Sequence, residues 1–180
     1  MEELLIITKS SEWQKLVRRL GVRQFQEFIN SAIRERTLIL MAKPVSLREE
    51  KEWSKSAGRE IGAGKLIKII LAVDGKLAGV CDVQKGRHKQ GHNATFGLMV
   101  VKKHRGKGYG EMLLRKGIEV ARKRFRPHKM WIEHIGGNEP ARKLYEKAGF
   151  REVARLKEYV NHFGSWRDRI IMEYKPGGRR

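Results

Sequence analysis

The chain has 180 residues, of which 40 are lysine or arginine and 20 are aspartate or glutamate, so its formal net charge at pH 7 is +20. This length suits one domain with a sizeable hydrophobic core, and the sequence has neither an apolar stretch long enough to span a membrane nor a secretory signal. The single cysteine, Cys81, excludes an internal disulfide. We therefore expect a cytoplasmic protein with no membrane contact, whose charge attracts anionic partners such as RNA and ribosomes nonspecifically.

Helix signals dominate the first third of the chain. Apolar residues recur every three or four positions over 13–20 and again over 22–33, a spacing typical of amphipathic helices. Two capping-box signatures, Ser11-x-x-Gln14 and Ser46-x-x-Glu49, indicate where the first and third helices begin. The predicted elements are a strand over residues 4–8, helices over 11–20, 22–36 and 47–58, and a flexible link over 62–64.

Strand signals follow. Two runs rich in Ile, Leu and Val, over 65–73 and 76–83, are separated only by Asp74-Gly75, which predicts a tight β-hairpin. A polar loop over 85–93 comes next; its two histidines lack a third ligand nearby, so we expect no metal site. The elements predicted beyond it are a strand over 94–101, a helix closed by Pro127, a strand over 129–135, a helix over 139–148, strands over 150–159 and 166–174, and a disordered tail over 176–180. This order predicts a single-domain α/β fold with a mixed sheet.

A basic, glycine-rich turn lies between the predicted strand over 94–101 and the helix after it. The turn consists of Arg105, Gly106, Lys107, Gly108, Tyr109 and Gly110. Glycines leave the backbone accessible, and the first N–H groups of a helix have no internal partner and sit at the positive end of its dipole. Such a turn binds anions, most often phosphates. It is neither a Walker loop nor a dinucleotide fingerprint, because the required Lys-Ser/Thr and the later acidic residue are missing.

A second motif occupies residues 138–150. Asn138 suits a helix cap, Pro140 its first turn and Gly149 its C-terminal exit. Together, Arg105-x-x-Gly108-x-Gly110 and Asn138-x-x-Ala141-x-x-Leu144-Tyr145-x-x-x-Gly149-Phe150 resemble the Gcn5-related N-acetyltransferase (GNAT) superfamily. The resemblance covers about residues 66–175 and is strongest to the acetyltransferases of ribosomal and other proteins.

This resemblance implies a domain over 1–175 with a mostly antiparallel sheet flanked by helices, whose splayed central strands form a cleft for acetyl-CoA. The glycine-rich turn would bind the pyrophosphate. The main chain of Leu98, Met99 and Val100 would hold the pantetheine arm and the thioester. Asn138 would contact the pantetheine, and Tyr145 would lie beside the sulfur. No metal is implied.

The same resemblance implies two catalytic residues. An amine with a pKa near ~10 must lose a proton before it attacks a carbonyl. Glu133, five residues before Asn138, is the predicted base, and partial burial in its apolar strand would raise its pKa. His134 points to the opposite strand face, so only one of the pair is expected at the cleft. Tyr145 is the predicted acid, which protonates the departing thiolate.

We therefore predict an acetyl-CoA-dependent N-acetyltransferase whose acceptor is a protein N-terminus or a lysine. Two alternatives stay open. One is an acetyltransferase of small amines such as polyamines, against which the net charge argues through repulsion. The other is a basic module that binds coenzyme A or RNA without turnover, against which the presence of both Glu133 and Tyr145 argues. The sequence identifies neither the acceptor nor the oligomeric state.

Overall fold

The computed structural model describes residues 1–175 and contains one sheet with strand order β1-β2-β3-β4-β5-β7-β6. The elements, in chain order, are β1 (Glu2–Ile7), α1 (Ser10–Leu20), α2 (Val22–Arg34), α3 (Leu47–Gly62), β2 (Leu66–Val73), β3 (Lys76–Lys85), the 3-10 turn η1 (His88–Gln90), β4 (Asn93–Val100), the 3-10 turn η2 (Lys102–His104), α4 (Tyr109–Arg124), β5 (Lys129–Ile135), α5 (Glu139–Ala148), β6 (Phe150–His162) and β7 (Ser165–Tyr174). All neighbouring strands are antiparallel except β4 and β5, which are parallel. The mixed, mostly antiparallel sheet predicted from the sequence is therefore confirmed.

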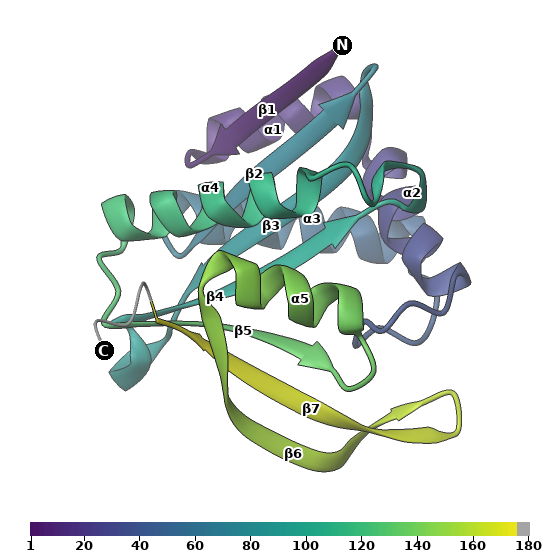
Figure 1. Cartoon of the computed structure of the whole chain (residues 1–180). Helices are drawn as coiled ribbons and strands as arrows, with labels where there is room; N and C mark the ends of the chain where they lie inside the picture. The colour runs from purple at the N-terminus through teal and green to yellow at the C-terminus, as the bar shows by residue number, and fades with distance from the viewer. Residues whose placement is uncertain (176–180) are drawn as a thin grey trace.

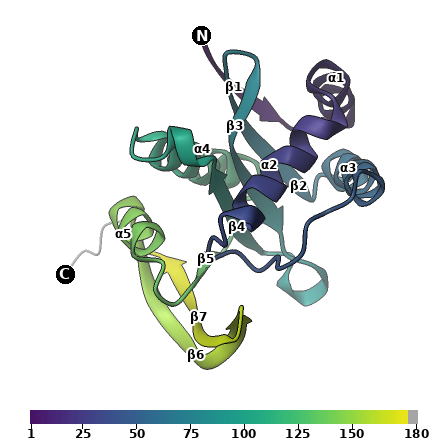
Figure 2. The ribbon, with the colours of Figure 1, turned by 90° about the vertical axis from the view of Figure 1, so that its right-hand side faces the viewer.

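Helices cover both faces of the sheet (Figures 1 and 2). Strand β2 is buried on both faces, and its side chains alternate between two hydrophobic cores. Ile67, Ile69 and Leu71 join the core that includes α4 and α5. Leu66 and Ile70 join the core that includes α1, α2 and α3. A strand covered on both faces appears in the sequence as an unbroken apolar run, as residues 66–73 do.

The predicted hairpin forms at Asp74-Gly75, where φ is +50° and +71°, as a tight turn of the primed type requires. A bulge between Leu71 and Ala72 then shifts the pairing of β2 with β3 by one residue. Because of that shift Lys68 lies opposite Asp82. The hairpin therefore places a lysine and an aspartate side by side within an otherwise apolar pair of strands.

The predicted end of the third helix near Gly58 is wrong, because α3 continues to Gly62. A Cβ at Gly58 would lie 3.2 Å from Cδ1 of Trp13 on α1. The small residue at 58 therefore serves the close approach of two helices and does not terminate one.

Of the two predicted capping boxes, one forms. Ser46 and Glu49 exchange hydrogen bonds of 2.7 and 3.2 Å between side chain and backbone, as predicted. The Ser11 box does not form, since α1 begins one residue earlier, at Ser10. The Glu12 carboxylate instead accepts the backbone N–H groups of residues 8 and 9.

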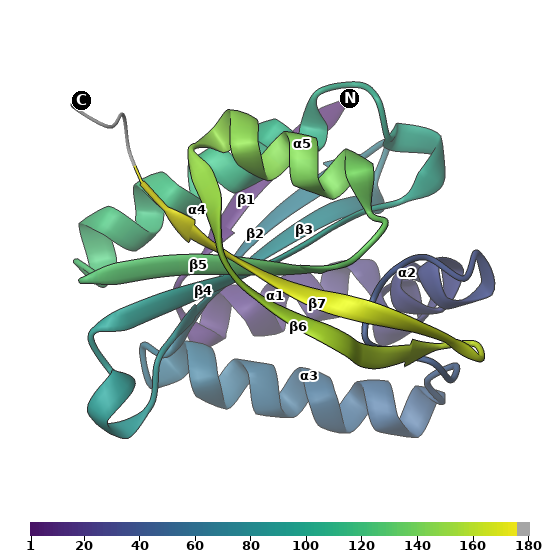
Figure 3. The ribbon, with the colours of Figure 1, turned by 60° about the horizontal axis from the view of Figure 1, so that its bottom comes forward.

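Strands β4 and β5 separate partway along their length. They pair only from Asn93 with Lys129 to Phe96 with Ile132. Beyond Phe96, β4 continues along β3 alone, and β5 continues along β7, which forms a long hairpin with β6 (Figure 3). The predicted splay of the central strands is therefore confirmed. The predicted disordered tail, 176–180, lies outside the described residues, and within residues 1–175 no helix is both long and apolar enough to cross a membrane.

Candidate functional site

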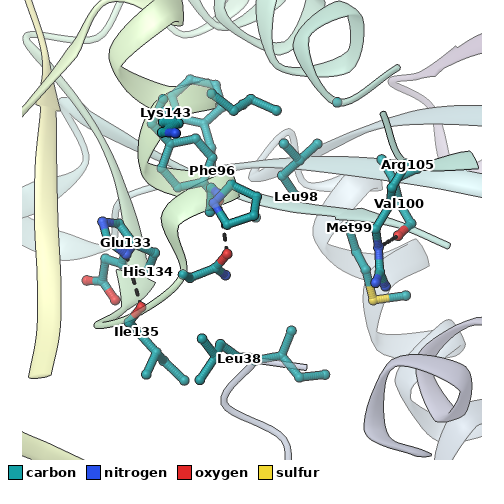
Figure 4. A pocket seen from close by; sticks show the side chains of 18 of the residues that line it. Leu38, Phe96, Leu98, Met99, Val100, Arg105, Glu133, His134, Ile135 and Lys143 are labelled. Atoms are coloured by element: carbon teal, nitrogen blue, oxygen red, sulfur yellow. Dashed lines mark hydrogen bonds between the residues drawn. The ribbon is translucent and has the colours of Figure 1, made fainter. Parts of the chain in front are cut away.

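A cavity of about 680 Å³ opens where β4 and β5 separate. Residues 97–100 of β4 and 133–135 of β5 line it, together with the N-terminal turns of α4 and α5 and the loop after α2. In Figure 4, Met99, Val100 and Arg105 lie on one side of the cavity and Glu133 and His134 on the other. The volume lies in the range of small-molecule sites.

The glycine-rich turn leaves the N-terminus of α4 open toward this cavity. Gly106 and Gly108 adopt φ of +76° and +82°, and an added Cβ at either would meet no atom within 4 Å. Gly108 is the N-cap, and no side chain caps the helix. Gly110 serves a different purpose, because a Cβ there would lie 2.7 Å from Cδ1 of Leu144 on α5. The turn therefore combines free backbone N–H groups with open space, as an anion site requires.

Two of the predicted turn residues, Lys107 and Tyr109, do not line the cavity. The Tyr109 hydroxyl instead donates a hydrogen bond to Glu2 on β1. Arg105 does line it. Its Nε donates to the Val100 carbonyl at 2.9 Å and its Nη1 to Glu35 at 2.8 Å. In this structure Arg105 therefore joins the turn to the end of β4.

The predicted thioester-binding residues, Leu98, Met99 and Val100, all line the cavity. Their backbones pair with β3 on one side, opposite Cys81, Val80 and Gly79. On the other side β5 has already diverged, so no strand within residues 1–175 pairs with this edge. The main chain of β4 can therefore form hydrogen bonds with a ligand in the cleft.

Asn138 and Tyr145 are brought to the cavity by α5. The Asn138 side chain accepts the N–H of Ala141 at 3.3 Å, which is the predicted helix cap, and Gly149 ends the helix with φ of +103°. Tyr145 is 6 % exposed, and burial raises the pKa of its phenol above the usual range. The phenol therefore stays protonated at neutral pH, which is the state that a proton donor needs.

Glu133 lies at the mouth of the cavity and pairs with Arg169 of β7. The Arg169 Nε and Nη2 atoms lie 2.8 and 2.5 Å from the same carboxylate oxygen. The Glu133 side chain is 37 % exposed, so the strand does not bury it as the sequence predicted. The two hydrogen bonds from the arginine fix the orientation of the carboxylate.

His134 also lines the cavity, so the prediction that only one of Glu133 and His134 reaches the cleft is wrong. At its end β5 departs from strict alternation, since the consecutive residues His134 and Ile135 are both buried and both line the cavity. His134 is buried, and its ring centroid lies 6.1 Å from that of Tyr145. Its Nε2 atom has no hydrogen-bond partner within the described residues.

Sequence reasoning missed two contributors to the site. The pairing of β5 with β7 places Arg169 opposite Ile135, and from there its side chain reaches Glu133, although the two residues are far apart in the chain. The loop residues Leu38, Ile39 and Leu40 line the cavity as well. An apolar run outside any helix or strand was the available signal for this loop.

Comparisons with known proteins agree with this geometry. A family model described as the acetyltransferase (GNAT) family matches residues 27–150. The chain is 29% identical over 107 residues to the L-amino acid N-acetyltransferase AaaT of Escherichia coli (strain K12). That alignment covers 58% of the chain and 65% of the relative, so the chain spans just under two thirds of the relative's length.

Solved structures share the fold over nearly the whole chain. The ribosomal-protein-alanine N-acetyltransferase from Brucella melitensis matches with a TM-score of 0.75 at 24% identity, over 94% of this chain and 98% of that one. The protein yncA from Salmonella typhimurium, solved with its cofactor acetyl-CoA, matches with a TM-score of 0.75 at 18% identity, over 99% and 96%. At sequence identities of 24% and 18%, these matches show that the fold is shared and nothing further.

Proposed function

The chain belongs to the GNAT family of acetyltransferases, and we propose that it transfers the acetyl group of acetyl-CoA to an amine, at a protein N-terminus or a lysine side chain. One observation carries the proposal. The uncapped N-terminus of α4 opens into the same cavity that Glu133 and Tyr145 line. An anion-binding helix end, a proton acceptor and a proton donor around one cleft are what acyl transfer from a phosphorylated thioester carrier requires.

In this proposal the backbone anchors the co-substrate. The N–H groups that follow Gly106 and Gly108 bind the pyrophosphate, and the positive end of the α4 dipole favours its charge. The free edge of β4 at Leu98, Met99 and Val100 holds the pantetheine arm. A main-chain N–H of the same edge stabilises the oxyanion that develops on the thioester carbonyl.

Glu133 and Tyr145 carry the protons. Glu133 accepts a proton from the ammonium group of the acceptor, which frees the nitrogen lone pair to attack the thioester carbon. The carbon–sulfur bond then breaks, and Tyr145 donates its phenolic proton to the departing thiolate. The nitrogen still carries one proton more than the amide product, and that proton passes to the phenolate, which restores Tyr145. Arg169 supports the first step, because it orients the Glu133 carboxylate before the acceptor arrives.

A small amine is the second candidate acceptor. The E. coli relative is named for L-amino acids, and a second, largely apolar cavity adjoins the cleft at residues 97–99 of β4. A small molecule fits such a cavity more completely than a protein surface does.

Release of free thiol from acetyl-CoA tests the proposal. The wild-type chain should be assayed with N-terminal peptides, a lysine-containing protein, spermidine and simple monoamines. We expect thiol release that depends on one acceptor class. Saturable binding of acetyl-CoA without thiol release for any acceptor would instead favour a binding module without turnover.

A further inference from the structure

A second cavity, of about 560 Å³, lies between the sheet and helices α2 and α3. Its apolar wall comes from Phe25, Phe28, Ile29, Val45, Trp53 and Val80. It shares Gly97, Leu98 and Met99 of β4 with the first cavity, and Ile39 of the loop after α2 also lines both. A molecule held in it therefore reaches the strand to which we assign the thioester, from the face of the sheet that α4 and α5 do not cover.

One carboxylate faces this apolar cavity without a partner. Glu50 on α3 is 5 % exposed, and within the described residues nothing forms a hydrogen bond with its carboxylate. Burial raises the pKa of Glu50, and the charge of Lys68 only partly opposes that effect. The carboxylate is open to the cavity, so a ligand there can supply the hydrogen-bond partner that the described residues do not.

The nearby lysine is already neutralised. The Nζ atom of Lys68 lies 2.5 Å from Oδ1 of Asp82, and the lysine side chain is 2 % exposed. The same nitrogen sits 4.5 Å from the Trp53 ring centroid and 5.5 Å from that of Trp13. An aspartate and two aromatic faces therefore surround this charge, so it is not available to bind a carboxylate of the substrate.

The cavity is negative within a strongly positive protein. Three carboxylates line it, those of Glu49, Glu50 and Asp82, against two ammonium groups, those of Lys43 and Lys68. Glu49 is engaged in the α3 capping box and Asp82 in the pair with Lys68. Of the three carboxylates, that of Glu50 is the one without a hydrogen-bond partner among the described residues, and a cation is the ligand that would bind it.

We propose that this cavity is the acceptor site and that Glu50 binds the ammonium group of an amine bearing one apolar or aromatic side group, an inference that rests on the proposed function. The carboxylate supplies a charge-assisted hydrogen bond, and the aromatic wall covers the side group. A free carboxylate on the acceptor would face Glu50 and be rejected. A polycation would also be rejected, because its additional ammonium groups would lie against the apolar wall without partners. Of the two acceptor classes proposed above, the cavity therefore favours the small amine, and specifically one that is monocationic and apolar.

The test measures equilibrium binding by calorimetry to the full chain. The probe is 2-phenylethylamine, and 2-phenylethanol is its uncharged analogue. We expect the wild-type chain to bind the amine about tenfold more tightly than the alcohol, as one charged hydrogen bond implies. Glu50→Gln should bind both probes alike. Glu52→Gln is the matched control, because Glu52 lies on the same helix, is exposed and pairs with Lys55, and it should keep the preference.

Equal affinity of the wild-type chain for both probes, no binding of either, or a preference that survives Glu50→Gln would overturn the proposal. A thermal melt shows that the variant is folded, since replacing a buried unpaired carboxylate should not lower its Tm. With 2-phenylethylamine as acceptor, Glu50→Gln should raise KM about tenfold and leave kcat within about twofold. Charge-selective binding without thiol release would contradict only the proposed function. Thiol release without charge-selective binding would contradict only the proposed acceptor site.

Discussion

At the scale of single residues, the two groups proposed to move protons have opposite surroundings. Tyr145 is buried beside His134 and Phe150, and its hydroxyl has no hydrogen-bond partner within the described residues. Tyr145→Phe should therefore leave the Tm nearly unchanged, because no hydrogen bond is lost. Its kcat should fall about 100-fold, as for loss of a general acid. A stopped-flow assay of thiol release measures this fall, and an unchanged kcat would remove Tyr145 from the mechanism.

Glu133 is exposed and paired, so its role as a base needs a test that separates catalysis from structure. Glu133→Gln keeps a hydrogen bond to Arg169 but cannot accept a proton. We expect kcat to fall about 100-fold at pH 7 with little change in the KM for acetyl-CoA. Arg169→Gln is the companion variant, which should lower kcat far less because the carboxylate remains. If Glu133→Gln retains wild-type kcat, Glu133 serves only the pairing of β5 with β7.

Glu50 makes the stability of the fold depend on pH. Its pKa is raised in the folded state, so the folded chain holds this proton more tightly than the unfolded chain does. The stability that this gives is complete below the unfolded pKa, near ~4.3, and is lost as the pH rises through the folded pKa. The free energy of unfolding of the wild-type chain, minus that of Glu50→Gln, should therefore decrease from acid to neutral pH. Urea titrations of both chains at several pH values measure this difference. The same pH dependence of the free energy of unfolding in both chains would contradict the burial of an ionisable Glu50.

At the scale of elements, the glycine-rich turn and helix α4 form the proposed anion site. Gly108→Ala places a side chain in the left-handed region, at a cost of about 1 kcal/mol, and a methyl group in the space proposed for the pyrophosphate. Gly64 has φ of +66° and equally open surroundings, but it does not line the cavity. Gly64→Ala should therefore lower the Tm similarly, whereas Gly108→Ala alone should raise the Kd of coenzyme A about tenfold or more. Equal coenzyme affinities in the two variants would place the pyrophosphate elsewhere.

The sequence alone was sufficient to predict the turns and helix ends that depend only on neighbouring residues. The turn at Asp74-Gly75, the cap at Asn138 and the exit at Gly149 each depend on neighbouring residues, and all are confirmed. Gly58 was wrongly predicted to end the third helix. A glycine stands there because the helix approaches Trp13 closely, and Trp13 is distant in the chain.

The second cavity, which we propose as the acceptor site, depends on a strand register that hydrophobic periodicity does not reveal. An undistorted hairpin at Asp74-Gly75 would place Lys68 opposite Cys81, and the bulge after Leu71 moves it opposite Asp82. The ion pair that leaves Glu50 uncompensated therefore follows from one extra residue in β3. Of the residues that the sequence predicted to bind the coenzyme, all but Lys107 and Tyr109 line the first cavity, whereas the partners of Arg105 and Glu133 arise from tertiary contacts.

At the scale of the whole molecule, the net charge of +20 acts differently on the two substrates. It attracts acetyl-CoA and repels a polycation, and added salt screens both effects. Raising the ionic strength from about 0.05 to 0.5 M should lower kcat/KM for acetyl-CoA and raise that for spermidine, while a monoamine changes least. Steady-state kinetics at fixed pH measure all three. A fall for spermidine similar to that for acetyl-CoA would show that the surface charge does not select the acceptor.

The central claim is that one cleft transfers an acetyl group to an amine, and the most direct test is the mass of the acceptor. The wild-type chain is incubated with acetyl-CoA and each acceptor, and the products are analysed by mass spectrometry beside Tyr145→Phe. We predict that one acceptor class gains an acetyl group on its nitrogen, and that the variant slows this gain about 100-fold. Bound acetyl-CoA with no acetylated acceptor, or the same product formed equally fast by the variant, would contradict the account.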